Sequence, residues 1–167
     1  MKSKTEMEKD LRQTLDRAGI PYEVLPCDPD FADTAAFCER YGVPRENSGN
    51  TILVATKKEP KRFALCVVLA STRLDVNHAV RGLMEGLKVS FASAEDTGRI
   101  TGMELGGVTP FNLPDDLPVF VDQEVMRADY IVLGGGGRSS KIKISPEIFR
   151  SIPNIKIVPG LSLKNSG

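Results

Sequence analysis

Thr51-Ile-Leu-Val-Ala-Thr56 and, five residues later, Arg62-Phe-Ala-Leu-Cys-Val-Val-Leu-Ala70 are the strongest strand signals in this chain. Both runs are rich in apolar and β-branched residues, and the polar segment Lys57–Lys61 between them predicts a turn. We therefore expect an antiparallel hairpin. The second run is apolar without a break from Ala64 to Ala70, which is typical of a strand covered on both faces.

Helix and strand patterns alternate on both sides of this hairpin. On its N-terminal side, a capping box at Thr5 and Glu8 predicts a helix over residues 5–18. A short strand over 22–25 and a helix over 35–41, capped at Asp33-Thr34, follow it. On the C-terminal side we expect helices from Asp75 to residue 84 and from Ser93 onward, with a strand over 88–91 between them.

The last third of the chain predicts strands over 119–122, 130–133, 141–144 and 155–158, with a short helix opened by Ser145-Pro146. Hairpins and helices are interleaved, so a mixed sheet is favoured over a purely parallel one. We expect a single α/β domain over residues 1–167, built on a mixed, mostly antiparallel β-sheet flanked by helices. A chain of 167 residues is long enough for one such domain with a sizeable core.

Composition narrows the function. The formal net charge is +0, which argues against a protein that mainly binds DNA or other nucleic acid non-specifically. Three cysteines without CxxC spacing and one histidine suggest neither a zinc site nor a disulfide scaffold, so we expect no metal, no cofactor and a cytoplasmic location. No run approaches the length of a membrane span and the first residues lack a signal-peptide pattern, so no membrane partner is expected.

Two glycine-rich loops are the main candidates for a binding site. The first contains Gly106-Gly107, where the absence of a Cβ atom permits close approach to the main chain. Pro110 follows shortly afterwards and fixes its own φ angle. The second runs from Gly134 to Gly137 and continues as Arg138-Ser-Ser-Lys141. Together they predict a pocket built from main chain. Glycines that serve turn geometry alone are the other interpretation of the second loop, and its continuation as a strand excludes a Walker-type phosphate loop.

Charged and reactive side chains outside these loops have structural interpretations. Arg138, Lys141 and Lys143 suit either phosphate contacts or a solvated strand face, and the group Lys57, Lys58, Lys61 and Arg62 suits either a soluble turn or a nucleic-acid backbone. His78 has no partner at a catalytic spacing, Cys38 and Cys66 fall on apolar faces, and Asp115-Asp116 lie in a proline-bounded turn.

Several separated segments, in the same order, resemble the YbaK/aminoacyl-tRNA deacylase family, which is related to the editing domain of bacterial prolyl-tRNA synthetases. The most specific is Thr101-Gly-Met-Glu-Leu-Gly-Gly-Val-Thr-Pro-Phe111, which is similar to the family's Gly-x-x-x-Pro loop, here Gly106 to Pro110. The others are Asn50-Thr-Ile-Leu-Val-Ala55, Arg73-Leu-Asp75 and the strand–glycine–strand segment over 131–144. The resemblance covers about residues 32–159.

The resemblance implies a YbaK-like fold and hydrolysis, in trans, of the ester that joins a wrong amino acid to tRNA. The partners would be the tRNA acceptor end and a synthetase. It implies catalytic roles for Asn50 and Gly106, in a backbone-lined pocket where the substrate's own ribose hydroxyl assists. The expected substrate-binding residues are Gly107, Val108, Thr109, Pro110, Phe111, Gly135, Gly136, Arg138 and Lys141.

One position departs from the family pattern. A lysine usually precedes the Thr or Ser that opens the first long strand, and Asn50 stands there in this chain. Asparagine exchanges hydrogen bonds but carries no positive charge. Two hypotheses therefore remain: a free-standing deacylase, in which Lys57 or Lys141 could supply the charge, and a non-catalytic module that binds the aminoacyl-adenosine end of tRNA.

Overall fold

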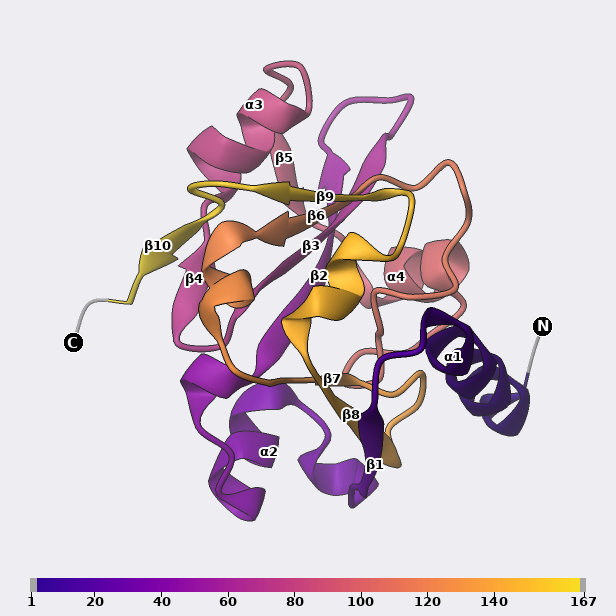
Figure 1. Ribbon diagram of the computed structural model, residues 1–167. Helices are drawn as coiled ribbons and strands as arrows, with labels where there is room; N and C mark the ends of the chain where they lie inside the picture. Colours follow the sequence, from indigo (N-terminus) through magenta and orange to yellow (C-terminus); the bar gives the residue numbers. More distant parts are fainter. Residues whose placement is uncertain (1–2, 166–167) are drawn as a thin grey trace.

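The computed structural model describes residues 3–165, in which ten strands form three hydrogen-bonded sheets (Figure 1). The central sheet has the order β5-β2-β3-β6-β9, a second sheet β1-β8-β7, and a third β10-β4. The strands are β1 Tyr22–Pro26, β2 Gly49–Thr56, β3 Phe63–Leu69, β4 Thr72–Leu74, β5 Val89–Phe91, β6 Val119–Asp122, β7 Ile131–Gly134, β8 Ser140–Ile144, β9 Ile155–Val158 and β10 Ser162–Lys164.

The predicted hairpin is the centre of the fold. β2 and β3 pair antiparallel, with Thr51 opposite Val67 and Leu53 opposite Leu65. β2 begins two residues earlier than the sequence predicted, at Gly49. β3 lies between β2 and β6, and its residues 64–68 are fully buried, as its unbroken apolar run indicated.

The predicted fold class is confirmed. Five of the seven strand pairs within residues 3–165 are antiparallel, and only β3–β6 and β6–β9 are parallel. β4 and β10 were not predicted, because each has only three residues and depends on pairing with the other. The sheets are linked by a parallel bridge from Ser48 to Val132, which holds the start of β2 against β7.

Four α-helices cover the sheets: α1 Lys4–Ala18, α2 Thr34–Tyr41, α3 Arg81–Leu83 and α4 Ala94–Thr101. α1 begins earlier than predicted, because Ser3 rather than Thr5 caps it by accepting from the Glu6 amide. Ser93 caps α4 as expected, through the Asp96 amide. Short 3-10 helices occupy Pro29–Phe31, Arg45–Asn47, Gln123–Arg127 and, where a short helix was predicted, Pro146–Arg150.

The helix predicted from Asp75 to Met84 forms differently. Asp75 does cap it, accepting from the His78 amide, but Val76–Val80 adopt a wide π turn before the single turn of α3. Glu85 and Gly86 then take positive φ angles of 60° and 79°, which ends the segment. Periodicity alone does not distinguish these winding patterns, because they bury similar residues.

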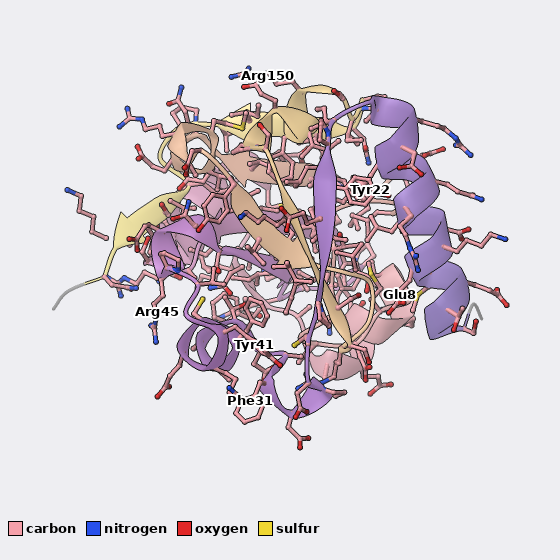
Figure 2. All side chains as sticks on the ribbon, turned by 60° about the horizontal axis from the view of Figure 1, so that its bottom comes forward. Glu8, Tyr22, Phe31, Tyr41, Arg45 and Arg150 are labelled. Atoms are coloured by element: carbon pink, nitrogen blue, oxygen red, sulfur yellow. The ribbon has the colours of Figure 1, made fainter. Side chains whose placement is uncertain are left out.

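α1 packs along β1 at one side of the molecule (Figure 2). Its Leu11 and Leu15 are buried in the largest core cluster, beside Phe111 and Phe149, whose ring centroids are 6.0 Å apart. The Tyr22 hydroxyl of β1 donates to the Asp16 carboxylate of α1 at 2.9 Å. No helix in residues 3–165 combines the length and apolar character required to cross a bilayer.

Cys66 gives the stability of this core a pH dependence. Burial raises the pKa of its thiol from 9.0 to about 12, so the folded protein keeps a proton that the unfolded chain releases. The contribution is intact below about pH 9 and is lost as the pH rises toward 12. By urea denaturation at pH 8 and 10.5, we expect the wild type to lose about 2 kcal/mol more than Cys66→Ala. Parallel pH profiles would contradict this prediction.

Candidate functional site

The two glycine loops meet main chain to main chain. The Gly136 amide donates to the Gly107 carbonyl at 2.8 Å. A Cβ atom on Gly107 would lie 2.6 Å from the Gly137 carbonyl carbon, and one on Gly134 would lie 2.2 Å from the Val108 oxygen. Side chains cannot fit at either contact, so glycine is required there by close approach.

A cavity of about 350 Å³ lies where these loops face the start of β2. The first loop supplies Leu105, Gly106 and Val108, and the β7–β8 hairpin supplies Gly134 and Lys141. β2 supplies Gly49, Asn50 and Thr51, and the start of α2 supplies Asp33 and Thr34. The structure therefore brings together Asn50, Gly106, Val108 and Lys141 from the predicted set.

Lys141 is the buried cation of this cavity, with 5% of its surface exposed. Its ammonium donates to the carbonyl oxygens of Ala32 and, at 2.8 Å, of Gly106. It also lies 5.5 Å from the centroid of the Phe37 ring. These two hydrogen bonds use two of its three N–H donors, and among the described residues no protein acceptor takes the third. Burial, with a smaller contribution from nearby Arg138, lowers the pKa of Lys141.

Arg138 binds the first glycine loop and the start of α2 through hydrogen bonds. Its guanidinium donates to the Asp33 carboxylate at 3.1 Å, to the Leu105 carbonyl at 2.7 Å and twice to the Pro29 carbonyl. These bonds tie the β7–β8 hairpin to both the first glycine loop and the start of α2. Arg138 is not among the residues that line the cavity, and four of its five N–H donors are engaged within the protein, so the phosphate contact stays a prediction. Asp33, expected to cap α2, makes no side-chain capping bond and binds Arg138 instead.

The main-chain groups of Asn50 and Thr51 point to opposite edges of β2. The Ser48 carbonyl accepts from the Ala70 amide and the Thr56 amide donates to the Arg62 carbonyl, at the two ends of β3. Asn50 is an even number of residues from both Ser48 and Thr56, so its main chain also faces β3. The main-chain groups of Thr51 therefore point out of the opposite edge of β2. β5 covers that edge only as far as Leu53, whose carbonyl accepts from Ala92.

Thr51 is a candidate site residue that the sequence analysis missed. It lines the cavity, and its buried side-chain oxygen has no hydrogen-bond partner within residues 3–165. Side chains alternate along a strand, so the Thr51 side chain lies on the opposite face of the sheet from that of Asn50. The alternation of side chains along the predicted strand was the sequence signal that could have indicated Thr51 as a site residue.

The remaining predicted residues lie outside this cavity. Thr109 and Phe111 are only 2% and 1% exposed, and Phe111 belongs to the core. Both line a second cavity of about 360 Å³ between α1 and the end of α4, together with Gly136. Pro110 is buried between them. Gly107 and Gly135 serve packing, since a Cβ on Gly135 would lie 2.4 Å from the Ser140 hydroxyl.

α1 also contacts the β7–β8 hairpin. The Ser140 hydroxyl donates to the Glu8 carboxylate at 3.4 Å, and Figure 2 shows Glu8 on the face of α1 toward the β7–β8 turn. Within residues 3–165, no three His, Cys, Asp or Glu side chains cluster in a way that could hold a metal ion.

The model of the aminoacyl-tRNA editing domain matches residues 28–152. The chain belongs to this family. The match begins just after β1 and extends past β8, and it includes both glycine loops and every residue that lines the first cavity. The predicted resemblance is thereby confirmed.

Relatives of similar length support the assignment. The chain is 21% identical over 156 residues to the "Putative Cys-tRNA(Pro)/Cys-tRNA(Cys) deacylase EbsC" of Enterococcus faecalis, covering 92% of this chain and 93% of that protein. It is 34% identical over 62 residues to the uncharacterized protein YwhH of Bacillus subtilis, covering 37% and 40%. A solved structure described as "a putative trans-editing enzyme for prolyl tRNA synthetase" has the same fold, with a TM-score of 0.75, 18% identity and coverage of 96% and 98%.

Proposed function

We propose that this editing-domain protein acts in trans as a deacylase that hydrolyses the ester between a wrongly attached amino acid and the terminal ribose of tRNA. The observation that carries the proposal is the cavity between Gly106 and the open edge of β2, with the buried ammonium of Lys141 at its wall. Such a substrate is made and consumed where translation takes place, so we propose a cytoplasmic location and a synthetase as a partner.

The donors around the cavity suit ester hydrolysis. Water adds to the ester carbonyl, and the oxygen that becomes negative requires preorganised donors. The free N–H of Lys141 and the outward-turned amide of Thr51 are available for this role. The neighbouring ribose hydroxyl accepts a proton from the water and passes it to the ester oxygen as the C–O bond breaks, so the products are a free amino acid and tRNA with its ribose hydroxyls restored.

Size selects among amino acids in such a site. A cavity of about 350 Å³ shared with the ribose end leaves room for a small side chain. Each methylene difference is worth only about 1–3 kcal/mol in an apolar pocket, so we expect graded discrimination among small amino acids.

The test is a panel of aminoacylated tRNAs incubated with catalytic amounts of the protein. We expect ester loss well above the uncatalysed rate for at least one tRNA that carries a small, wrong amino acid. The rate should be proportional to enzyme concentration and should exceed that of the correctly charged tRNA. No acceleration on any tRNA, even with the protein in molar excess over the substrate, would contradict the proposal.

Asn50 supports a second candidate, a module that binds the aminoacyl-adenosine end without turnover. It predicts saturable binding of a non-hydrolysable aminoacyl-adenosine analogue, no deacylation by the wild type, and gain of activity in Asn50→Lys. The ammonium of Lys141 in the same cavity favours the enzyme, because the positive charge absent at position 50 is present on β8.

A further inference from the structure

A further concave surface lies at the other end of β2 from the candidate site. It has a volume of about 520 Å³ and lies between the β2–β3 hairpin and the segment that leads into β5. Figure 1 shows both segments at the end of the molecule opposite α2, whose first residues line the candidate site. We call it the hairpin groove, and its lining is Thr56, Lys57, Lys58, Glu59, Pro60, Arg62, Arg81, Gly86, Leu87 and Lys88.

The hairpin groove is strongly basic in a chain without net charge. Five of its lining residues are Lys or Arg, and only Glu59 is acidic. Arg62 is paired with Glu85 at 3.0 Å, and Arg81 donates to the Gly86 carbonyl at 2.8 Å. Lys57, Lys58 and Lys88 are exposed and form no ion pair with any residue between 3 and 165. Their charges are therefore available to an anionic partner.

β2 connects this groove directly to the candidate site. Thr51 lines the cavity and Thr56 lines the groove, five residues further along the strand. At about 3.4 Å per residue, the two sites are about 17 Å apart. β5 pairs with one edge of β2 over residues 54–56, next to the groove, and leaves that edge uncovered at Thr51, next to the cavity. A polynucleotide strand that ended in the cavity would reach the groove within a few phosphates.

We propose that the hairpin groove binds the phosphate backbone of the tRNA whose aminoacylated end occupies the cavity. The inference rests on the proposed function, because it takes that tRNA as the ligand. Exposed lysines bind phosphates mainly through release of counterions, which produces an affinity that decreases steeply with salt. The groove thus supplies affinity for the tRNA body, and the cavity supplies recognition of the aminoacyl end.

The test replaces the three unpaired lysines together, as Lys57→Gln/Lys58→Gln/Lys88→Gln. The matched control, Lys9→Gln/Lys156→Gln/Lys164→Gln, removes the same charge from exposed positions outside the groove. Binding of uncharged tRNA is measured by fluorescence anisotropy between 50 and 200 mM salt. We expect the groove variant to bind at least about tenfold more weakly at the lower salt, with a salt slope smaller by about 2–3. The control should keep both values near those of the wild type.

Deacylation assays then separate the two proposals. With aminoacyl-tRNA, kcat/KM of the groove variant should decrease at least about tenfold, whereas an aminoacylated trinucleotide, which ends before the groove, should be hydrolysed as by the wild type. Unchanged tRNA affinity and salt slope in the groove variant, or an equal loss in the control, would overturn the groove proposal. Lysine-dependent tRNA binding without any deacylation would support the groove and contradict the deacylase.

Discussion

Gly134→Ala is expected to destabilise the protein by about 3 kcal/mol and to abolish deacylation. Its new Cβ would lie 2.2 Å from the Val108 carbonyl oxygen and 3.1 Å from the Gly107 carbonyl carbon, both of which are main-chain atoms. The first loop must therefore move away from β7, which disturbs the cavity that Val108 and Gly134 both line. For a chain of this length, the melting temperature should decrease by about 6–12 °C.

Gly82→Ala is the matched control. Gly82 lies in α3, and a Cβ there has no heavy atom within 4 Å. Its replacement should leave stability unchanged or raise it by up to about 1 kcal/mol, since alanine favours a helix. Similar melting temperatures and rates for Gly134→Ala and the wild type would show that the contact between the loops is not a constraint on the fold.

Lys141→Met is expected to decrease kcat/KM for deacylation by about 100-fold or more, if the protein is the deacylase proposed. Removing one preorganised donor from an oxyanion site typically has an effect of this size. The variant also leaves the buried Ala32 carbonyl oxygen and the partly buried Gly106 carbonyl oxygen without their donor, so a loss of stability of about 1–3 kcal/mol should accompany it. Lys143→Met, two residues along β8, is the control and should change the rate little, since Lys143 does not line the cavity.

The pH dependence of the deacylation rate tests whether the positive charge of Lys141 contributes to catalysis. Because burial lowers the pKa of Lys141 below 10.5, the fraction that is protonated decreases at a lower pH than for an exposed lysine. After subtraction of the uncatalysed rate, wild-type activity should decrease on this alkaline limb. Lys141→Arg, if active, should lack it, because arginine stays charged. A Lys141→Met variant within threefold of the wild-type rate would exclude Lys141 from the reaction.

The sequence by itself was sufficient for the central hairpin and most of the strands. The runs over 51–56 and 62–70 carry their own β preference, and the turn between them brings them together locally. The helix caps at Ser93 and Asp75 were also predictable from the sequence, since each side chain accepts from an amide only three residues away. The first glycine loop was recognisable as well, because its content of Gly and Pro excludes a helix or an inner strand.

The tertiary structure alone decided which side chains meet at the cavity. Lys141 and Arg138 find their partners between 33 and 109 residues away, and no periodicity in the chain encodes those pairings. The same applies to Thr51, whose main-chain groups face the edge of β2 that β5 leaves uncovered before Leu53. Phe111 shows the converse: a residue of the binding-loop motif was drawn into the core because apolar burial against Phe149 outweighs exposure at a site. Local patterns determine elements, whereas the packing of distant elements determines which groups face a ligand.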